Sequence, residues 1–168
     1  MFQQVISKKD LSRNYARGAI KILANMETQK NGAFCGVASS VTVLNSLLDH
    51  SFKPESSGSK GFQHFDQDNF FNKPKTAEFS SEKQVSSRGM RFSELVNLLN
   101  CQEGAHAEGF SKKDMVVQGG IQVFREICKK ALCTDDQFLL AYYGRDLVSM
   151  EGRGHISPVA AYHEEKGL

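Results

Sequence analysis

The sequence predicts an α+β fold in which helices come first and a short antiparallel sheet follows. Two observations predict it. Apolar residues recur at helical spacing in three segments between residues 35 and 132. The last third instead holds two short runs of apolar and aromatic residues separated by glycines, which is typical of paired strands. The 168 residues favour a single domain spanning residues 1–168.

Three helices are expected in the first two thirds of the chain. The first covers Cys35–Asp49, where apolar residues at 37, 41, 44 and 48 share one face. The second covers Phe92–Asn100, and the third covers about Gly120–Leu132, with one apolar stripe at residues 121, 124, 127 and 128. The polar block Ser111–Asp114 fits either a loop or the first turn of a helix.

The segment from His50 to Gly89 is predicted to be irregular, because it is rich in serine and contains two prolines. Phenylalanines interrupt it, and we expect them to anchor the loop to the core: Phe52, Phe62, Phe65, Phe70, Phe71 and Phe79. A short helical piece is expected near Asp66–Asn72. Long ordered loops in compact domains are often functional.

Two strands and a turn are predicted in the last third. Gln137–Tyr143 is a short apolar and aromatic run, and His155–His163 alternates loosely. The composition of residues 164–167 is typical of a hairpin turn.

Composition excludes several classes of protein. Lys plus Arg number 21 and Asp plus Glu number 19, so the net charge of +2 argues against a nucleic acid or an anionic membrane as partner. No apolar run reaches the roughly 18 residues of a membrane span. The stretch Met1–Lys9 has no secretory apolar region, and four cysteines make no disulfide scaffold. These features favour a cytoplasmic location.

The clearest local feature is a cysteine, Cys35, directly before a long apolar helix. The positive end of the helix dipole stabilises a thiolate there, and the thiolate is the nucleophilic form. Gly36 is expected to let a substrate backbone approach closely. The alternative is an inert, buried cysteine that opens a core helix.

A cysteine nucleophile needs a base, and His155 is the strongest candidate because it follows Gly152-Arg153-Gly154 and opens a strand. Cys on an early helix and His on a later strand is the order of papain-like cysteine peptidases. Gln29, six residues before Cys35, matches the oxyanion donor of such sites. The alternative for His155 is a histidine at a turn.

Arg145 follows the predicted strand end and is able to bind a substrate carboxylate through two hydrogen bonds. It equally fits a solvated strand terminus. The other cysteines show no zinc-binding spacing, and we interpret Cys128 as a core residue and Cys101 and Cys133 as incidental.

Four blocks of this sequence resemble the catalytic domain of phytochelatin synthases, especially the short prokaryotic phytochelatin synthase-like proteins. They lie in family order between Gln29 and Tyr162 and cover most of the chain: Gln29–Asn45, Phe65–Phe71, Phe124-Arg125, and Tyr143-Gly144-Arg145 followed by Gly154–Tyr162.

The resemblance implies a papain-like fold in which Cys35 attacks the Cys–Gly bond of glutathione. Glycine leaves, and the γ-glutamylcysteinyl thioester passes to water or to a second glutathione, giving phytochelatin in a heavy-metal response. His155 is then the general base and acid, and Gln29 lines the oxyanion hole. Arg145, Tyr142 and Gly154 lie at the substrate site, although the family commonly has Asn where this chain has Tyr142.

The resemblance implies no fixed cofactor or metal site, because heavy-metal ions such as Cd, Zn and Cu act through glutathione thiolates. It also implies an Asp as third catalytic residue, on a strand after the histidine strand. The chain stops at Leu168 before such a strand, and none of its Asp residues is assigned the role. We therefore expect a domain that is C-terminally incomplete relative to the family, either truncated or naturally short. The open strand edge suggests a homodimer.

Two alternative functions stay open. The chain fits another papain-like peptidase, or a non-catalytic remnant that binds glutathione or a partner protein.

Overall fold

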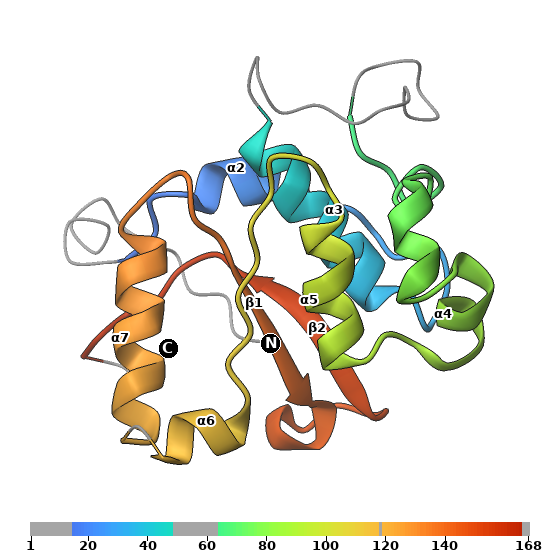
Figure 1. Cartoon of the computed structure of the whole chain (residues 1–168). Helices are drawn as coiled ribbons and strands as arrows, with labels where there is room; N and C mark the ends of the chain where they lie inside the picture. The colour runs from blue at the N-terminus through green and yellow to red at the C-terminus, as the bar shows by residue number, and fades with distance from the viewer. Residues whose placement is uncertain (1–14, 49–63, 118, 166–168) are drawn as a thin grey trace.

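The computed structural model describes residues 15–48, 64–117 and 119–165. Within them, helices pack around one antiparallel pair of strands, which confirms the predicted α+β class (Figure 1). The order of helices first and strands last is confirmed as well. The elements are α2 (Ala19–Ala24), α3 (Cys35–Leu47), η1 (Pro74–Glu78), α4 (Glu82–Arg88), α5 (Phe92–Asn100), α6 (Lys112–Val117), α7 (Ile121–Leu132), β1 (Leu139–Gly144), η2 (Arg145–Val148) and β2 (Gly154–Val159).

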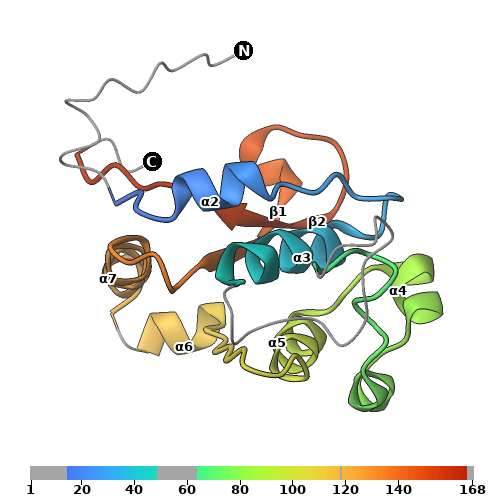
Figure 2. The same cartoon turned by 90° about the horizontal axis from the view of Figure 1, so that it is seen from above.

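Helix α3 lies at the centre of the fold. It contacts α2, α5 and β2, and seen from above it lies between the strand pair and α5 (Figure 2). The predicted apolar face is confirmed at Val37, Val41 and Leu44, which are all fully buried. They belong to the main core together with phenylalanines from the 65–71 loop, leucines from α5 and Ile156 from β2. This packing fixes the start of α3 relative to β2.

A second, smaller core lies beside β1 and is formed by α7. Its buried members are Cys128, Leu132 and Tyr162, so the interpretation of Cys128 as a core residue is confirmed. The predicted stripe on α7 was wrong at Ile121, which is 61% exposed. Ile121 begins the helix and is not part of this core, whereas residues further along are. The polar block at 111–114 proves to be the first turn of α6, which begins at Lys112.

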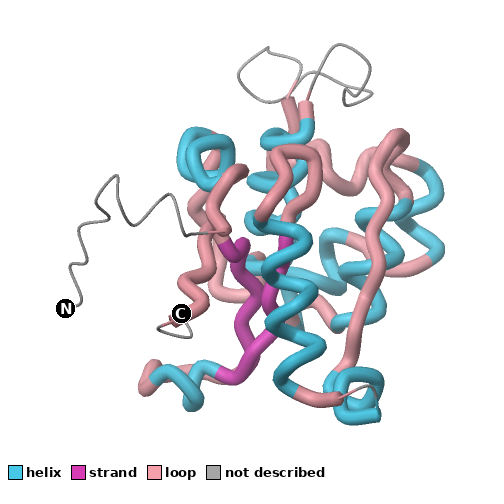
Figure 3. The backbone as a smooth tube through the Cα atoms, turned by 90° about the vertical axis from the view of Figure 1, so that its left-hand side faces the viewer, coloured by secondary structure: helices cyan, strands magenta, loops and turns pink. Residues whose placement is uncertain are grey.

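Strands β1 and β2 pair with Leu139 opposite Val159 and Gly144 opposite Gly154 (Figure 3). Both predicted strands exist, but the second one ends four residues early, at Val159. Tyr162 leaves the pair because its backbone bonds to Tyr15 instead, with N···O distances of 2.9 and 3.2 Å. Glu164 and Glu165 form a turn, while the rest of the predicted 164–167 turn lies outside the described residues.

The predicted irregular segment from His50 to Gly89 was wrong over its second half, which contains η1 and α4. Residues 49–63 lie outside the described residues. Helix α4 forms because Ser81 and Gln84 make a capping box, with Ser81 N–H donating to Gln84 Oε1 at 2.8 Å and Gln84 N–H donating to Ser81 Oγ at 3.3 Å. Gly89, at φ 79°, ends the helix in a conformation that favours glycine.

The predicted helical piece near Asp66–Asn72 was also wrong, because these residues form a turn. Three of the expected anchors are confirmed, because Phe65 and Phe70 are buried and Phe71 packs against the core, whereas Phe79 is 36% exposed and lies outside the core cluster. Phe52 and Phe62 lie outside the described residues. The loop is therefore attached to the core through its first aromatic residues after position 64.

Gly36 is a point of close approach between α3 and β2. A Cβ atom there would lie 3.0 Å from Ile156 Cδ1 and 3.1 Å from Met90 Sδ, both side chains of the buried core. The expectation that Gly36 leaves room for a substrate backbone was wrong, because protein already fills that space. Its lack of a side chain instead lets the start of α3 lie against β2.

Candidate active site

Cys35 is the first residue of α3 and is partly exposed. The backbone N–H groups in the first turn of a helix have no partner within the helix, so they are available to a negative charge. The helix begins here because Asn31 forms a tight turn, in which its carbonyl oxygen accepts from Phe34 N–H at 3.2 Å. Asn31 Oδ1 also accepts from Ala33 N–H at 2.9 Å. The Cys35 thiol therefore lies at the start of the helix and is partly accessible.

Contacts between α3 and β2 hold Cys35 near the strand that carries His155. Gly36, next to Cys35, meets Ile156, next to His155. Ser39 Oγ donates to the Ile156 carbonyl oxygen at 2.9 Å, in a buried hydrogen bond that ties the two elements together. Among the contacts of the described residues, none joins the Cys35 thiol to the His155 ring directly. Catalytic hydrogen bonds are often long in ligand-free enzymes and tighten when substrate binds.

His155 lies between Arg145 and Tyr143. An Arg145 Nη2 atom is 3.0 Å from His155 Nδ1, and the Tyr143 and His155 rings meet edge to face with centroids 5.8 Å apart. A guanidinium only donates, so Nδ1 accepts and the imidazole is neutral, with its proton on Nε2. Burial lowers the pKa of His155, and the charge of Arg145 lowers it further.

We expect an Arg145→Gln variant to raise the pKa of His155. The substitution removes the positive charge but leaves the burial, so the pKa moves part of the way back toward its ordinary value of 6.5. At pH 6 a larger fraction of His155 is then protonated. The measurement is an NMR titration of the His155 ring in a Cys35→Ala background. An unchanged or lower pKa would contradict the contact with Arg145.

Gln29 lies in the loop before α3, and its side-chain Nε2 donates to the Asn31 carbonyl oxygen at 2.8 Å. That bond uses one of the two N–H groups of the amide. Gln29 and Cys35 are thus two ends of one loop, and the turn at Asn31 connects them. The role of Gln29 at an oxyanion stays a prediction.

The predicted substrate residues gather on the strand pair. A Cβ atom on Gly154 would lie 2.9 Å from the Tyr142 hydroxyl oxygen, so the Tyr142 ring covers Gly154. Half of Tyr142 is exposed. Arg145 is at the end of β1 and also donates to the Glu151 carbonyl oxygen at 3.3 Å. The strand pair thus brings Tyr142 next to Gly154 and Arg145 next to His155.

The remaining cysteines differ in their surroundings. Cys128 is buried and Cys101 partly buried, and burial raises the pKa of both thiols, while Cys133 is exposed. Across the described ranges, no group of three His, Cys, Asp or Glu side chains is arranged to hold a metal ion.

One residue that the sequence analysis did not select is Gln67. Its buried side chain bonds to the backbone on both sides of Gln29. The sequence carries only an indirect signal, because Asp66-Gln67-Asp68-Asn69 has the composition of a side-chain-stabilised turn. Nothing in the local pattern indicates that the partner of Gln67 lies 37 residues earlier.

These features define an α+β chain with a cysteine at the start of a central helix and a histidine on the strand that this helix contacts. The sequence matches the phytochelatin synthase family over residues 3–168, so the chain belongs to that family. None of the helices in the described part of the chain is long and apolar enough to cross a membrane.

Individual relatives are similar at low identity. The chain is 27% identical to glutathione gamma-glutamylcysteinyltransferase 3 of Lotus japonicus over 158 residues, which are 94% of this chain and 30% of that protein. It is 27% identical to glutathione gamma-glutamylcysteinyltransferase 1 of Arabidopsis thaliana over 165 residues, 98% of this chain and 31% of the relative. The corresponding protein of Triticum aestivum is 28% identical over 151 residues, 90% of this chain and 27% of the relative. The chain thus spans less than a third of the length of these three relatives.

Proposed function

We propose that the chain is a papain-like glutathione γ-glutamylcysteinyltransferase or peptidase with Cys35 as nucleophile and His155 as base. The observation that supports this most is the position of Cys35 at the start of α3, with the next residue packed against the strand of His155. Membership of the family, and relatives whose names specify glutathione as the substrate, support the choice of substrate.

The reaction proceeds in two steps. The neutral His155 ring first takes the proton of the Cys35 thiol at Nδ1, where this proton replaces the hydrogen bond from Arg145, so that a thiolate and an imidazolium form. The thiolate attacks the carbonyl carbon of the Cys–Gly bond, and the oxyanion accepts hydrogen bonds from the Cys35 backbone N–H and the Gln29 amide. The carbon–nitrogen bond then breaks, and glycine leaves with the proton that His155 delivers to its nitrogen. Water or the amino group of a second glutathione next attacks the thioester, with His155 accepting its proton. The products are γ-glutamylcysteine or phytochelatin.

Arg145, Tyr142 and Gly154 are proposed to contact the substrate. The guanidinium of Arg145 suits a glutathione carboxylate, because it binds carboxylates through paired hydrogen bonds. Heavy-metal ions enter as glutathione thiolates and need no fixed site on the protein. A metal-bound thiolate is part of the substrate in this proposal.

The test is incubation of the whole chain with glutathione, with and without Cd²⁺, followed by analysis of all products. We expect free glycine to equal the sum of γ-glutamylcysteine and newly formed γ-glutamylcysteine units in phytochelatin. Cleavage of unrelated peptides with glutathione untouched would replace this proposal by another papain-like peptidase. Calorimetric binding of glutathione without any glycine release would identify a non-catalytic binding protein.

A further inference from the structure

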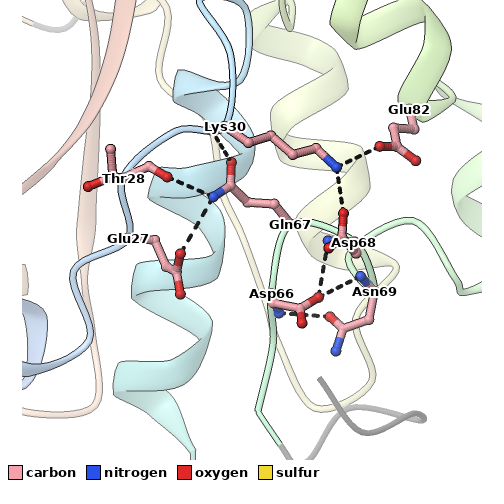
Figure 4. Close-up of polar contacts among 8 residues, drawn as sticks. All are labelled: Glu27, Thr28, Lys30, Asp66, Gln67, Asp68, Asn69 and Glu82. Atoms are coloured by element: carbon pink, nitrogen blue, oxygen red, sulfur yellow. Dashed lines mark hydrogen bonds and ion pairs between the residues drawn. The ribbon is translucent and has the colours of Figure 1, made fainter. Parts of the chain in front are cut away.

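The side chain of Gln67 binds the chain on both sides of Gln29 (Figure 4). Its Oε1 accepts from the Lys30 backbone N–H at 2.9 Å, and its Nε2 donates to the Thr28 carbonyl oxygen at 2.9 Å. Nε2 also lies 3.5 Å from Glu27 Oε2. Gln67 is only 8% exposed. One buried carboxamide thus uses both its acceptor and its donor to fix the residue that precedes and the residue that follows Gln29.

The loop that carries Gln67 is itself held rigidly. Asp66 Oδ1 accepts from the backbone N–H groups of Asp68 at 3.0 Å and Asn69 at 2.8 Å, and Asn69 Oδ1 accepts from Asp66 N–H at 2.9 Å. The amide of Asn45, on α3, binds both backbone groups of Phe65, at 2.8 and 2.9 Å. Gln67 is therefore placed by α3, the same helix that begins with Cys35.

The segment 27–30 has other contacts, but they are local, further from Gln29 or exposed. The Gln29 amide donates to the Asn31 carbonyl oxygen at 2.8 Å, an exposed contact within the same loop. Glu27 N–H donates to Thr42 Oγ1 on α3 at 3.1 Å. This bond holds the segment at Glu27, two residues before Gln29. Lys30 Nζ binds Asp68 at 2.6 Å and Glu82 at 2.7 Å. Burial alone would lower the pKa of Lys30, but these two carboxylates raise it. The Asp68 side chain is 71% exposed, and water screens such an ion pair.

We propose that Gln67 is a positioning residue that holds the Gln29 segment in place beside Cys35. The inference rests on the proposed function, because it adds a support to the same site. Gln67 acts through Gln29, whose amide stabilises charge that develops only in the transition state. Loss of the clamp therefore lowers kcat and leaves KM nearly unchanged, because ground-state binding does not use it.

The experiment compares Gln67→Leu with the parent in the full-length chain, using glutathione as substrate. We expect kcat for glycine release to fall about tenfold to a hundredfold, as small misplacements of catalytic groups do, with KM within about twofold. Hydrogen exchange of the Lys30 backbone amide gives a second readout. This amide should exchange on the order of tenfold faster in Gln67→Leu, because its acceptor is gone.

The matched control is Gln102→Leu. Gln102 is a buried glutamine, 2% exposed, that donates to the Phe70 carbonyl oxygen of the same loop at 3.2 Å. Loss of this side chain should reduce thermal stability. It should leave kcat and the hydrogen-exchange rate of the Lys30 backbone amide as in the parent. If Gln67→Leu does not fold, Gln67→Glu replaces it. A carboxylate still accepts from Lys30 N–H, so Lys30 stays protected, but it no longer donates to Thr28 and kcat falls.

Three results would overturn the clamp. These are unchanged exchange of the Lys30 amide in Gln67→Leu, an equal loss of kcat in Gln102→Leu, and a kcat at parental level in Gln67→Glu. Failure of the proposed function is distinguishable, because the parent itself would then release no glycine. In that case, the hydrogen-exchange rate of the Lys30 backbone amide in Gln67→Leu still shows whether Gln67 holds this segment.

Discussion

A Cys35→Ser variant is expected to release glycine from glutathione about a thousandfold more slowly than the parent, or not at all. A serine hydroxyl occupies the same position at the start of α3. It does not ionise near neutral pH, however, so the helix dipole has no thiolate to stabilise. The measurement is initial-rate glycine release at saturating glutathione.

The matched control for this variant is Cys133→Ser. Cys133 is an exposed cysteine at the end of α7, outside both core clusters, so this substitution should leave the rate as in the parent. Glycine release by Cys35→Ser at a rate close to the parent would remove Cys35 from the mechanism. A large loss in Cys133→Ser would mean that the assay reports general thiol chemistry.

The largest expected effect on stability comes from Phe34→Ala, directly before Cys35. Phe34 is fully buried, and the centroids of its ring and of the Phe71 ring lie 6.5 Å apart in an edge-on arrangement. Lys30 Nζ lies 4.9 Å from the centre of the same ring. Truncating a buried phenylalanine leaves a cavity and costs about 3–5 kcal/mol of unfolding free energy, a large part of the total stability of a small domain.

Urea unfolding of Phe34→Ala against Phe79→Ala measures this effect. Phe79 is the same residue type at 36% exposure and lies outside the core cluster, so its truncation should cost clearly less than that of Phe34. Equal urea midpoints of unfolding for the two variants would contradict the assignment of Phe34 to the core. Because Phe34 also precedes α3 directly, a destabilised Phe34→Ala should lose the ordered position of Cys35 together with the fold.

Much of the fold was predictable because three helices bury their faces at regular spacing. The periodicity of residues 37, 41 and 44 reflects their burial in α3, and the limits of α5 agree with the predicted ones. Helix α2 gave no such signal, because Ile22 is its buried residue while Ile20 and Leu23 are exposed. Helix α4 was missed because its capping box, Ser81 to Gln84, lies in a serine-rich stretch that resembles a loop.

The candidate site was predictable only where its geometry is local. Cys35 at a helix start follows from the sequence on its two sides, and the structure places the start of α3 there. The contact of Arg145 with His155 depends on the register of β1 and β2, which composition does not determine. The clamp of Gln67 on Thr28 and Lys30 joins segments far apart in the chain, so only tertiary packing brings them together.

The most direct test of the central claim is to trap the acyl group on the protein. The parent is mixed with glutathione, quenched in acid and digested, and the peptide that contains Cys35 is analysed by mass spectrometry. We expect a γ-glutamylcysteinyl group bound to Cys35 as a thioester, which hydroxylamine removes and which Cys35→Ser lacks. Glycine release with the acyl group on another residue, or a reductant-sensitive disulfide with intact glutathione as the only adduct, would contradict the account.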